Sequence, residues 1–295
     1  MLIYLSRTTH LSAPTPPAAA AHTTTVQDLP FENLTAPGTA DTIISTLGRH
    51  GEGHPYLLLH GGAGPQSVAA FAGQLATDAP GQVIAPTHPG FGGTRRPDRL
   101  DSIAKLAVLY RNLLDRLGLE NVTVVGNSIG GWTAAELALL RSPRVSRVIL
   151  VNAVGILVEE APVTEISGLT PDELSRLSFH DPAPFRVDPA SLTEQQLAAM
   201  AANRRALAVY GGQPPMTDPA LRDRLAGITT PTLVLWGESD EIVIPAYGRA
   251  YAEAIPGAEF RVLPGTGHVP QIETPQQLLN HVRTFAEAQP PNDPA

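Results

Sequence analysis

The sequence has no cysteine, no cluster of basic residues and no long hydrophobic run. The absence of cysteine excludes disulfides, thiolate zinc sites and a cysteine nucleophile. The net charge of −8 argues against nucleic acid or an anionic membrane as a partner. The longest apolar runs are short, as at Val148–Val151, so no transmembrane helix is expected. No group of His, Asp and Glu has the spacing of a metal site, and we expect neither a metal nor a cofactor.

The length of 295 residues, 43% of them apolar, is enough for one large domain with a buried core. Residues 1–24 begin mildly apolar and become rich in Pro and Ala, and Arg7 interrupts the apolar part. They match a secretion signal poorly. We expect them to form a disordered N-terminal extension of a cytoplasmic protein. The Pro-rich residues 289–295 are expected to form a C-terminal tail.

Short apolar runs alternate with amphipathic stretches along the rest of the chain. The runs from Tyr56 onward are continuous and rich in Val, Ile and Leu, which is typical of strands covered on both faces of a mostly parallel sheet. Amphipathic stretches such as Ile103–Leu117 and Ala246–Ala254 predict helices. The sequence therefore predicts an α/β fold. The expected strands are Thr42–Leu47, Tyr56–Leu59, Gln82–Ala85, Val122–Val125, Val148–Val151, Thr232–Trp236 and Glu259–Leu263.

The alternation stops between residues 155 and 220, where helix signals occur without a strand. Thr170 followed by Pro171 and two acidic residues predicts a helix start, and Thr193 followed by Glu and Gln predicts another. An insertion after a strand lies where open α/β sheets bind ligands. We expect residues 155–220 to form a helical cap on a core made of residues 25–154 and 221–288.

The pentapeptide Gly126-Asn127-Ser128-Ile129-Gly130 lies between an apolar run and a helical stretch. This strand–turn–helix context makes G-x-S-x-G a nucleophile elbow, in which the serine is strained and presented at the start of a helix. A glycine turn with Ser128 as a simple helix cap is the alternative. The context favours Ser128 as a nucleophile.

A serine hydroxyl needs a base, and the base needs an orienting carboxylate. His268 follows the strand Glu259–Leu263 in a glycine-rich loop, and Asp240 follows the strand Thr232–Trp236. Both residues, like Ser128, follow a strand, so all three are expected at one edge of the sheet, in the chain order Ser, Asp, His. Glu238 and Glu241 are alternatives to Asp240 as the carboxylate that orients His268. We favour Asp240 because its shorter side chain better suits a tight loop.

Hydrogen-bond donors for an oxyanion are expected from two loops. One is the backbone N–H after the nucleophile, at Ile129, and the other lies on an earlier strand–helix loop. His60-Gly61-Gly62-Ala63-Gly64 follows the strand Tyr56–Leu59 and supplies that loop, with Gly62 as the expected donor and Ala63 as the alternative. A phosphate cradle is disfavoured because the loop lacks the G-x-G-x-x-G spacing and the Lys-Ser/Thr of a P-loop.

The glycine loop after Tyr56–Leu59, the serine pentapeptide and the Asp240 and His268 loops together resemble the α/β-hydrolase fold superfamily. The resemblance extends from about residue 25 to 288. The resemblance implies a helical cap over the site, a triad of Ser128, Asp240 and His268, and Gly62 and Ile129 as oxyanion donors. Thr87-His88 stands where the family often has Asp. The resemblance is carried by His60-Gly61-Gly62-Ala63-Gly64, Pro89-Gly90-Phe91-Gly92-Gly93-Thr94, Gly126-Asn127-Ser128-Ile129-Gly130-Gly131, Trp236-Gly237 with Asp240, and Gly267-His268 with Pro270, Glu273 and Pro275.

Three functions are compatible with these residues. The first is a serine hydrolase acting on a small, mostly apolar ester, thioester or lactone, whose activity rises with pH as His268 loses its proton. The second is a carbon–carbon bond hydrolase of the meta-cleavage type, although Val269 follows His268 where that group often carries Trp. The third is a non-catalytic ligand-binding protein, because a fold alone does not establish an activity.

Overall fold

The computed structural model describes residues 25–30, 44–50, 53–78, 81–212 and 216–288. The expected N-terminal extension (1–24) and C-terminal tail (289–295) lie outside these residues. Within the described part of the chain, no helix combines the length and apolar character needed to cross a membrane.

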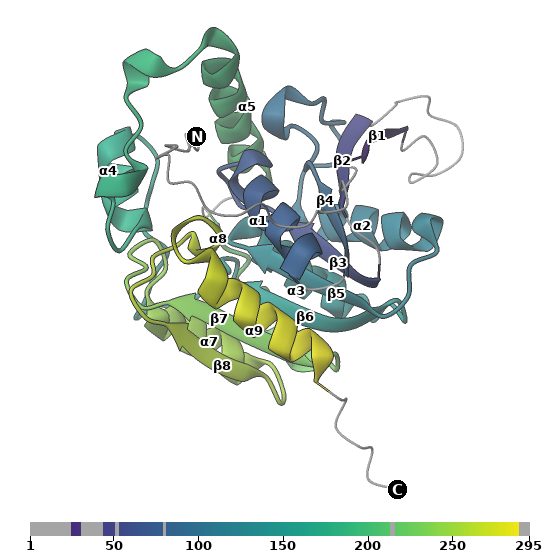
Figure 1. Cartoon of the computed structure of the whole chain (residues 1–295). Helices are drawn as coiled ribbons and strands as arrows, with labels where there is room; N and C mark the ends of the chain where they lie inside the picture. Colours follow the sequence, from purple (N-terminus) through teal and green to yellow (C-terminus); the bar gives the residue numbers. More distant parts are fainter. Residues whose placement is uncertain (1–24, 31–43, 51–52, 79–80, 213–215, 289–295) are drawn as a thin grey trace, which may run out of the picture.

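The described residues form an eight-stranded sheet in the order β1-β2-β4-β3-β5-β6-β7-β8 (Figure 1). β3 to β8 are parallel, whereas β2 runs antiparallel to both β1 and β4. The prediction of a mostly parallel sheet is therefore confirmed. The strands are β1 (Thr25–Pro30), β2 (Ile44–His50), β3 (His54–Leu59), β4 (Gly81–Pro86), β5 (Val122–Asn127), β6 (Val145–Val151), β7 (Thr232–Gly237) and β8 (Glu259–Leu263).

Helices cover both faces of this sheet. α1 and α9 pack on one face, and α2, α3 and α7 pack on the other. Leu57 and Tyr56, neighbours on β3, belong to the two opposite apolar layers because side chains alternate along a strand. The helices are α1 (Gln66–Asp78), α2 (Ile103–Leu117), α3 (Ile129–Leu139), α4 (Pro171–Ser178), α5 (Glu194–Tyr210), α6 (Leu221–Arg224), α7 (Pro245–Ala254), α8 (Pro270–Glu273) and α9 (Pro275–Glu287), with short 3-10 turns η1 (Phe91–Gly93), η2 (Ala183–Phe185), η3 (Pro189–Ser191) and η4 (Leu225–Gly227).

The chain between β6 and β7, residues 152–231, contains α4, α5 and α6, and we refer to it as the β6–β7 connection. Thr170 and Thr193 begin α4 and α5 with complete capping boxes, as the sequence predicts. In Figure 1 both helices project beyond one edge of the sheet. Gly155 and Thr217 form an isolated β-bridge, which joins the two ends of the projecting segment.

Candidate active site

Ser128 occupies a sharp turn between β5 and α3. Its φ of 57° and ψ of −118° are unfavourable for a residue with a side chain. A Cβ on Gly126 would lie 2.1 Å from the carbonyl oxygen of Gly130, and a Cβ on Gly130 would lie 2.3 Å from that of Leu59. Both flanking positions therefore require glycine. The local geometry is that of a nucleophile elbow.

Asp240 and His268 meet at the same edge of the sheet. Oδ2 of Asp240 lies 2.8 Å from Nδ1 of His268, and both side chains are buried. The other oxygen, Oδ1, accepts backbone N–H bonds from Ile242 at 2.9 Å and Val243 at 3.0 Å. These bonds fix the carboxylate, which in turn leaves Nε2 of His268 as the ring nitrogen available for chemistry.

The two competing glutamates are not in this position. Glu238 is exposed and accepts a hydrogen bond from the backbone N–H of Gly265 at 3.0 Å. Glu241 is exposed as well. Asp240 is therefore the carboxylate in contact with the imidazole.

The elbow and the His268 loop are joined by the side chain of Asn127, the residue before Ser128. Nδ2 of Asn127 donates to the carbonyl oxygen of His268 at 2.9 Å. Within the described residues, no hydrogen bond joins the Ser128 hydroxyl to the His268 ring. Such a bond often forms only when substrate is bound. The structure thus brings Asp240 and His268 into contact and holds the His268 loop against the turn that carries Ser128.

The glycine loop after β3 lies against the elbow. A Cβ on Gly61 would lie 2.9 Å from Oδ1 of Asn127 and 3.1 Å from Cβ of Ser128. The carbonyl oxygen of Gly61 accepts from the N–H of Gly64 at 3.0 Å and from Nδ1 of His60 at 2.8 Å. Because N–H and C=O of a trans peptide point in opposite directions, these bonds also fix the direction of the Gly62 N–H.

A buried pair of histidines holds this loop. The backbone N–H of His88 donates to Nε2 of His60 at 3.0 Å, so His60 carries its proton on Nδ1. Nε2 of His88 donates to the carbonyl oxygen of His60 at 2.9 Å, and its Nδ1 accepts from the hydroxyl of Tyr110. Burial lowers the pKa of His60 to about 4, and burial followed by the neighbouring His60 lowers the pKa of His88 well below its usual value. The pair is therefore neutral.

The α5 helix covers the same loop from the β6–β7 connection. A Cβ on Gly62 would lie 2.9 Å from Cδ2 of Leu207. Asn203 donates to the carbonyl oxygen of Ala63 at 3.0 Å and accepts from the N–H of Gly92 at 2.7 Å. The Tyr210 hydroxyl donates to the carbonyl oxygen of Pro89 at 3.0 Å. The last turns of α5 are thus hydrogen bonded to the loops next to Ser128.

Asn152 is a site residue that our sequence reasoning missed. It has a φ of 48° directly after β6, and its Nδ2 donates to Oδ2 of Asp240 at 2.6 Å and to the carbonyl oxygen of Gly267 at 3.0 Å. Its Oδ1 accepts from the N–H of Gly237 at 3.2 Å. A polar residue immediately after the apolar run Val148–Val151 was the available signal, since the other site residues also follow strands.

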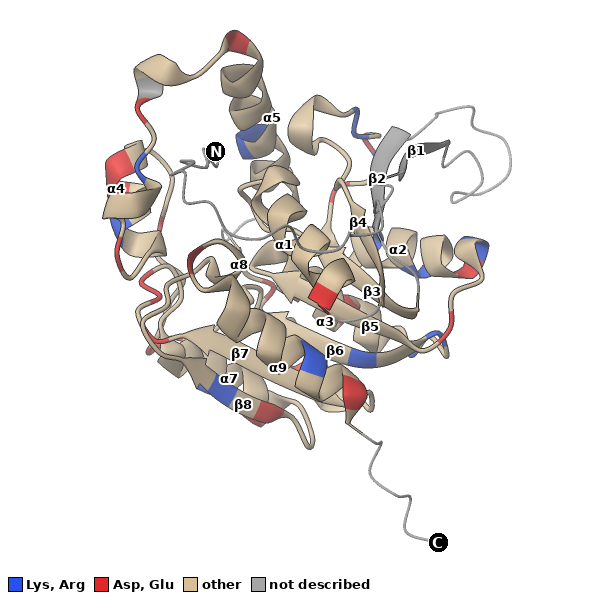
Figure 2. Cartoon of the chain, viewed as in Figure 1, with Lys and Arg blue, Asp and Glu red and all other residues tan. Residues whose placement is uncertain are grey.

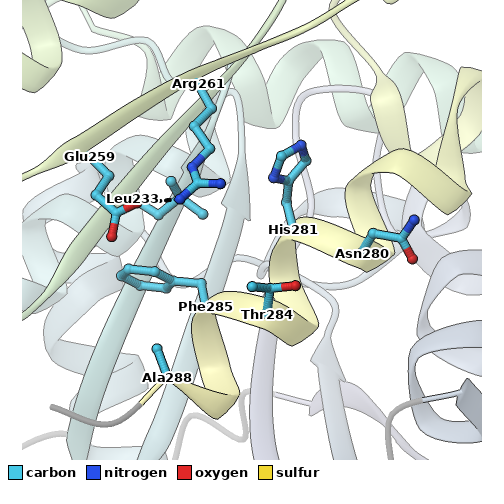
Figure 3. A pocket seen from close by; sticks show the side chains of 8 residues that line it. All are labelled: Leu233, Glu259, Arg261, Asn280, His281, Thr284, Phe285 and Ala288. Atoms are coloured by element: carbon cyan, nitrogen blue, oxygen red, sulfur yellow. Dashed lines mark hydrogen bonds and ion pairs between the residues drawn. The ribbon is translucent and has the colours of Figure 1, made fainter.

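No group of three or more potential metal ligands gathers anywhere in the described ranges. Charged residues of both signs are interspersed over the elements visible in Figure 2. A surface pocket of about 220 Å³ lies between β8 and the C-terminal half of α9, with Phe285, Arg261 and His281 among its lining residues (Figure 3). Leu233 and Glu259, which also line it, lie near the starts of their strands, so this pocket is at the opposite edge of the sheet from Ser128.

Comparison with known proteins places these features in a family. The sequence profile of the Alpha/beta hydrolase family matches residues 56–281. The chain belongs to this family. The α/β-hydrolase fold expected from the motifs is thereby confirmed, and the family implies a small-molecule substrate.

Similar proteins include an esterase and hydrolases of meta-cleavage products. The chain is 32% identical over 260 residues to a 2-hydroxymuconate semialdehyde hydrolase from Pseudomonas putida, covering 83% of this chain and 91% of that protein. A thermophilic esterase from Thermogutta terrifontis is similar in structure, with a TM-score of 0.67, 25% identity, and coverage of 90% of this chain and 98% of the esterase. A variant of a meta-cleavage product hydrolase has a TM-score of 0.65 and 25% identity, with coverage of 82% and 94%.

Proposed function

We propose that this α/β-hydrolase is a serine hydrolase that cleaves a small, mostly apolar ester, thioester or lactone through an acyl-enzyme. The observation that carries the proposal is the contact between Asp240 and His268, on a loop that is hydrogen bonded to the strained Ser128 turn through Asn127. Ser128 attacks the substrate carbonyl, and its proton passes to Nε2 of His268. Asp240 holds the ring in the required tautomer and stabilises the imidazolium.

The N–H groups of Gly62 and Ile129 are the proposed oxyanion donors. Ile129 begins α3, so its N–H has no acceptor within the helix, and the direction of the Gly62 N–H is fixed by the two bonds to the Gly61 carbonyl. Preorganised donors of this kind stabilise the developing oxyanion. The intermediate then collapses, His268 returns the proton to the leaving alcohol or thiol, and a water activated by His268 releases the acid.

We also propose that residues 155–220 act as a cap on the core formed by residues 25–154 and 221–288. The contacts of α5 with the Gly62 loop support this division. The substrate then lies between the strand ends and the cap, where open α/β sheets bind ligands. The cytoplasmic location stays a prediction.

A carbon–carbon bond hydrolase is the second candidate. It is favoured by the 32% identity to the 2-hydroxymuconate semialdehyde hydrolase. The same residues would act on a vinylogous diketone acid, with a carbon leaving group in place of an alcohol. The two candidates differ in substrate and share Ser128, Asp240 and His268.

Labelling with a fluorophosphonate, read by intact mass and peptide mapping, tests the nucleophile. We expect one adduct, on Ser128, in the folded wild type and none in Ser128→Ala. A panel of p-nitrophenyl esters, thioesters, lactones and meta-cleavage products then separates the two chemistries. Turnover of meta-cleavage products alone would favour the second candidate, and a folded wild type without an adduct or turnover would favour a ligand-binding protein.

A further inference from the structure

Residues 177–181, at the end of α4 in the β6–β7 connection, contact two loops of the proposed site. One carries Asp240 and is called the acid loop here, and the other carries His268 and is called the base loop. We call residues 177–181 the strap. The carbonyl oxygen of Ser178 accepts from the N–H of His268 at 2.8 Å, and that of Leu177 accepts from the N–H of Glu241 at 3.1 Å. The strap is therefore hydrogen bonded to His268 itself and to the residue that follows Asp240.

Two further contacts strengthen these attachments, one through side chains and one through a close approach of backbone. On the acid loop, Nδ1 of His180 lies 2.8 Å from Oγ of Ser239, the residue before Asp240. On the base loop, a Cβ on Gly267 would lie 2.3 Å from the carbonyl oxygen of Ser178, so the strap approaches as closely as a glycine permits. The strap thus ties the acid loop to the base loop.

Glu273 joins the strap to the base loop a second time. Its Oε1 accepts from the N–H of Asp181 at 3.0 Å, and its Oε2 accepts from the N–H of Gly267 at 2.6 Å. Hydrogen bonds from N–H groups to a carboxylate are stronger than bonds between neutral groups. An amide has a single acceptor oxygen, so Gln at this position would direct its NH₂ toward one of the two N–H donors.

We propose that Glu273 is a positioning residue, which couples the strap to the Gly267–His268 backbone and so keeps His268 in contact with Asp240. This inference rests on the proposed function, in which His268 moves the proton. Glu273 itself does not contact the reacting atoms. Its loss affects the rate through the placement of the imidazole, to which proton transfer is sensitive.

The test compares Glu273→Gln with Glu238→Gln as a matched control. Glu238 accepts an N–H bond from Gly265 of the same loop, so the control removes the same charge and a similar bond. Its carboxylate makes no hydrogen bond to the strap in the described structure. The measurements are kcat and KM on an ester that the wild type turns over, the rate of fluorophosphonate labelling of Ser128, and the thermal unfolding midpoint.

We expect Glu273→Gln to lower kcat and the labelling rate by about 10- to 100-fold, with KM changed by less than about threefold. The control stays within about twofold of wild type. Wild-type rates in Glu273→Gln, or equal losses in both variants, would overturn the inference. If Glu273→Gln does not fold, Glu273→Asp is measured instead, because it keeps the charge but shortens the reach to the N–H groups of Asp181 and Gly267, and an unchanged kcat there overturns the coupling.

Hydrogen exchange gives a readout that does not depend on activity. We expect Glu273→Gln to speed exchange in the peptides that contain Asp181 and Gly267, and Glu238→Gln to leave the Asp181 peptide protected. If the wild type is not labelled at Ser128, the proposed function fails, while exchange still reports whether Glu273 couples the two segments. Whether or not the enzyme is active, unchanged exchange in Glu273→Gln at the peptides that contain Asp181 and Gly267 would refute the coupling.

Discussion

The Asp240 carboxylate lies 2.8 Å from Nδ1 of His268, and both of its oxygens accept further hydrogen bonds. Oδ2 is shared with Nδ2 of Asn152, and Oδ1 accepts two backbone N–H bonds. The site around this carboxylate therefore contains only donors. A neutral amide at position 240 would have to direct its NH₂ either at the donors that now face Oδ2 or at the two N–H groups that now face Oδ1.

Asp240→Asn is expected to lower kcat by about 10⁴-fold, because the amide favours the wrong tautomer of His268. The measurement is steady-state kinetics on the best substrate of the panel. Glu241→Gln is the control, since that exposed side chain takes no part in the acid–base contact. A kcat for Asp240→Asn within tenfold of wild type would show that Asp240 does not orient the base.

Ser128→Ala and Ser128→Gly are both expected to abolish turnover but to differ in stability. At an ordinary backbone position, Gly is less stable than Ala by about 0.5–1 kcal/mol. At a φ of 57° and ψ of −118° the side chain is strained, and we expect the order to reverse. Urea unfolding of the two variants measures this difference, and an Ala variant clearly more stable than the Gly variant would contradict a strained elbow.

Gly62→Ala is expected to lower kcat by about two- to tenfold, because the new methyl group meets the end of the Leu207 side chain and the strain is shared between that side chain and the proposed oxyanion donor. Leu207→Ala removes the obstructing side chain. The double variant should therefore recover part of the lost rate, and a double-mutant cycle measures this coupling. Strictly additive effects of the two changes would argue against the contact as the cause.

The buried histidines predict acid sensitivity of the fold. The pKa of His60 is lowered to about 4 by burial, so between pH 4 and 6.5 the unfolded chain binds a proton at this residue that the folded chain does not. The free energy of unfolding therefore falls as pH drops through this window, by about 1.4 kcal/mol per pH unit for one such histidine. His88, whose pKa is also lowered by burial and then by the neighbouring His60, acts in the same direction.

Urea unfolding at pH 5 and pH 7 measures this dependence. His60→Asn keeps an N–H donor near the position of Nδ1 but cannot take up a proton, so its stability should change less between the two pH values than that of the wild type. His281→Asn is the control, because that ring is only partly buried whereas His60 is fully buried. An identical pH dependence in wild type and His60→Asn would exclude His60 as a source.

Local sequence signals predicted much of this fold. The helix Ile103–Leu117 was predicted with its observed bounds, and the capping boxes at Thr170 and Thr193 marked two helix starts. These features depend on residues within one or two turns of each other. The strand β1 was not predicted, and it lies at the edge of the sheet, where it pairs antiparallel with β2.

The chemistry of the candidate site was easier to predict than its supports. Asp240 and His268 were predicted to meet because both follow parallel strands, and the structure places them in contact. The bonds of Asn152 to Asp240, and of His88 to His60, join residues 88 and 28 positions apart. The place of Asn152 after a strand was a local signal, but the partner of each residue is set by the packed tertiary structure and leaves no local pattern.

The strap offers main-chain atoms to the core at three places: the carbonyl groups of Leu177 and Ser178 and the N–H of Asp181. Every residue type supplies these carbonyl groups, and every type except proline supplies the N–H. Mutation can therefore replace side chains of this segment, and so change what the proposed cap presents to a substrate, while these three main-chain hydrogen bonds are kept. The range of substrates of such an enzyme can then change while Asp240 and His268 keep their positions.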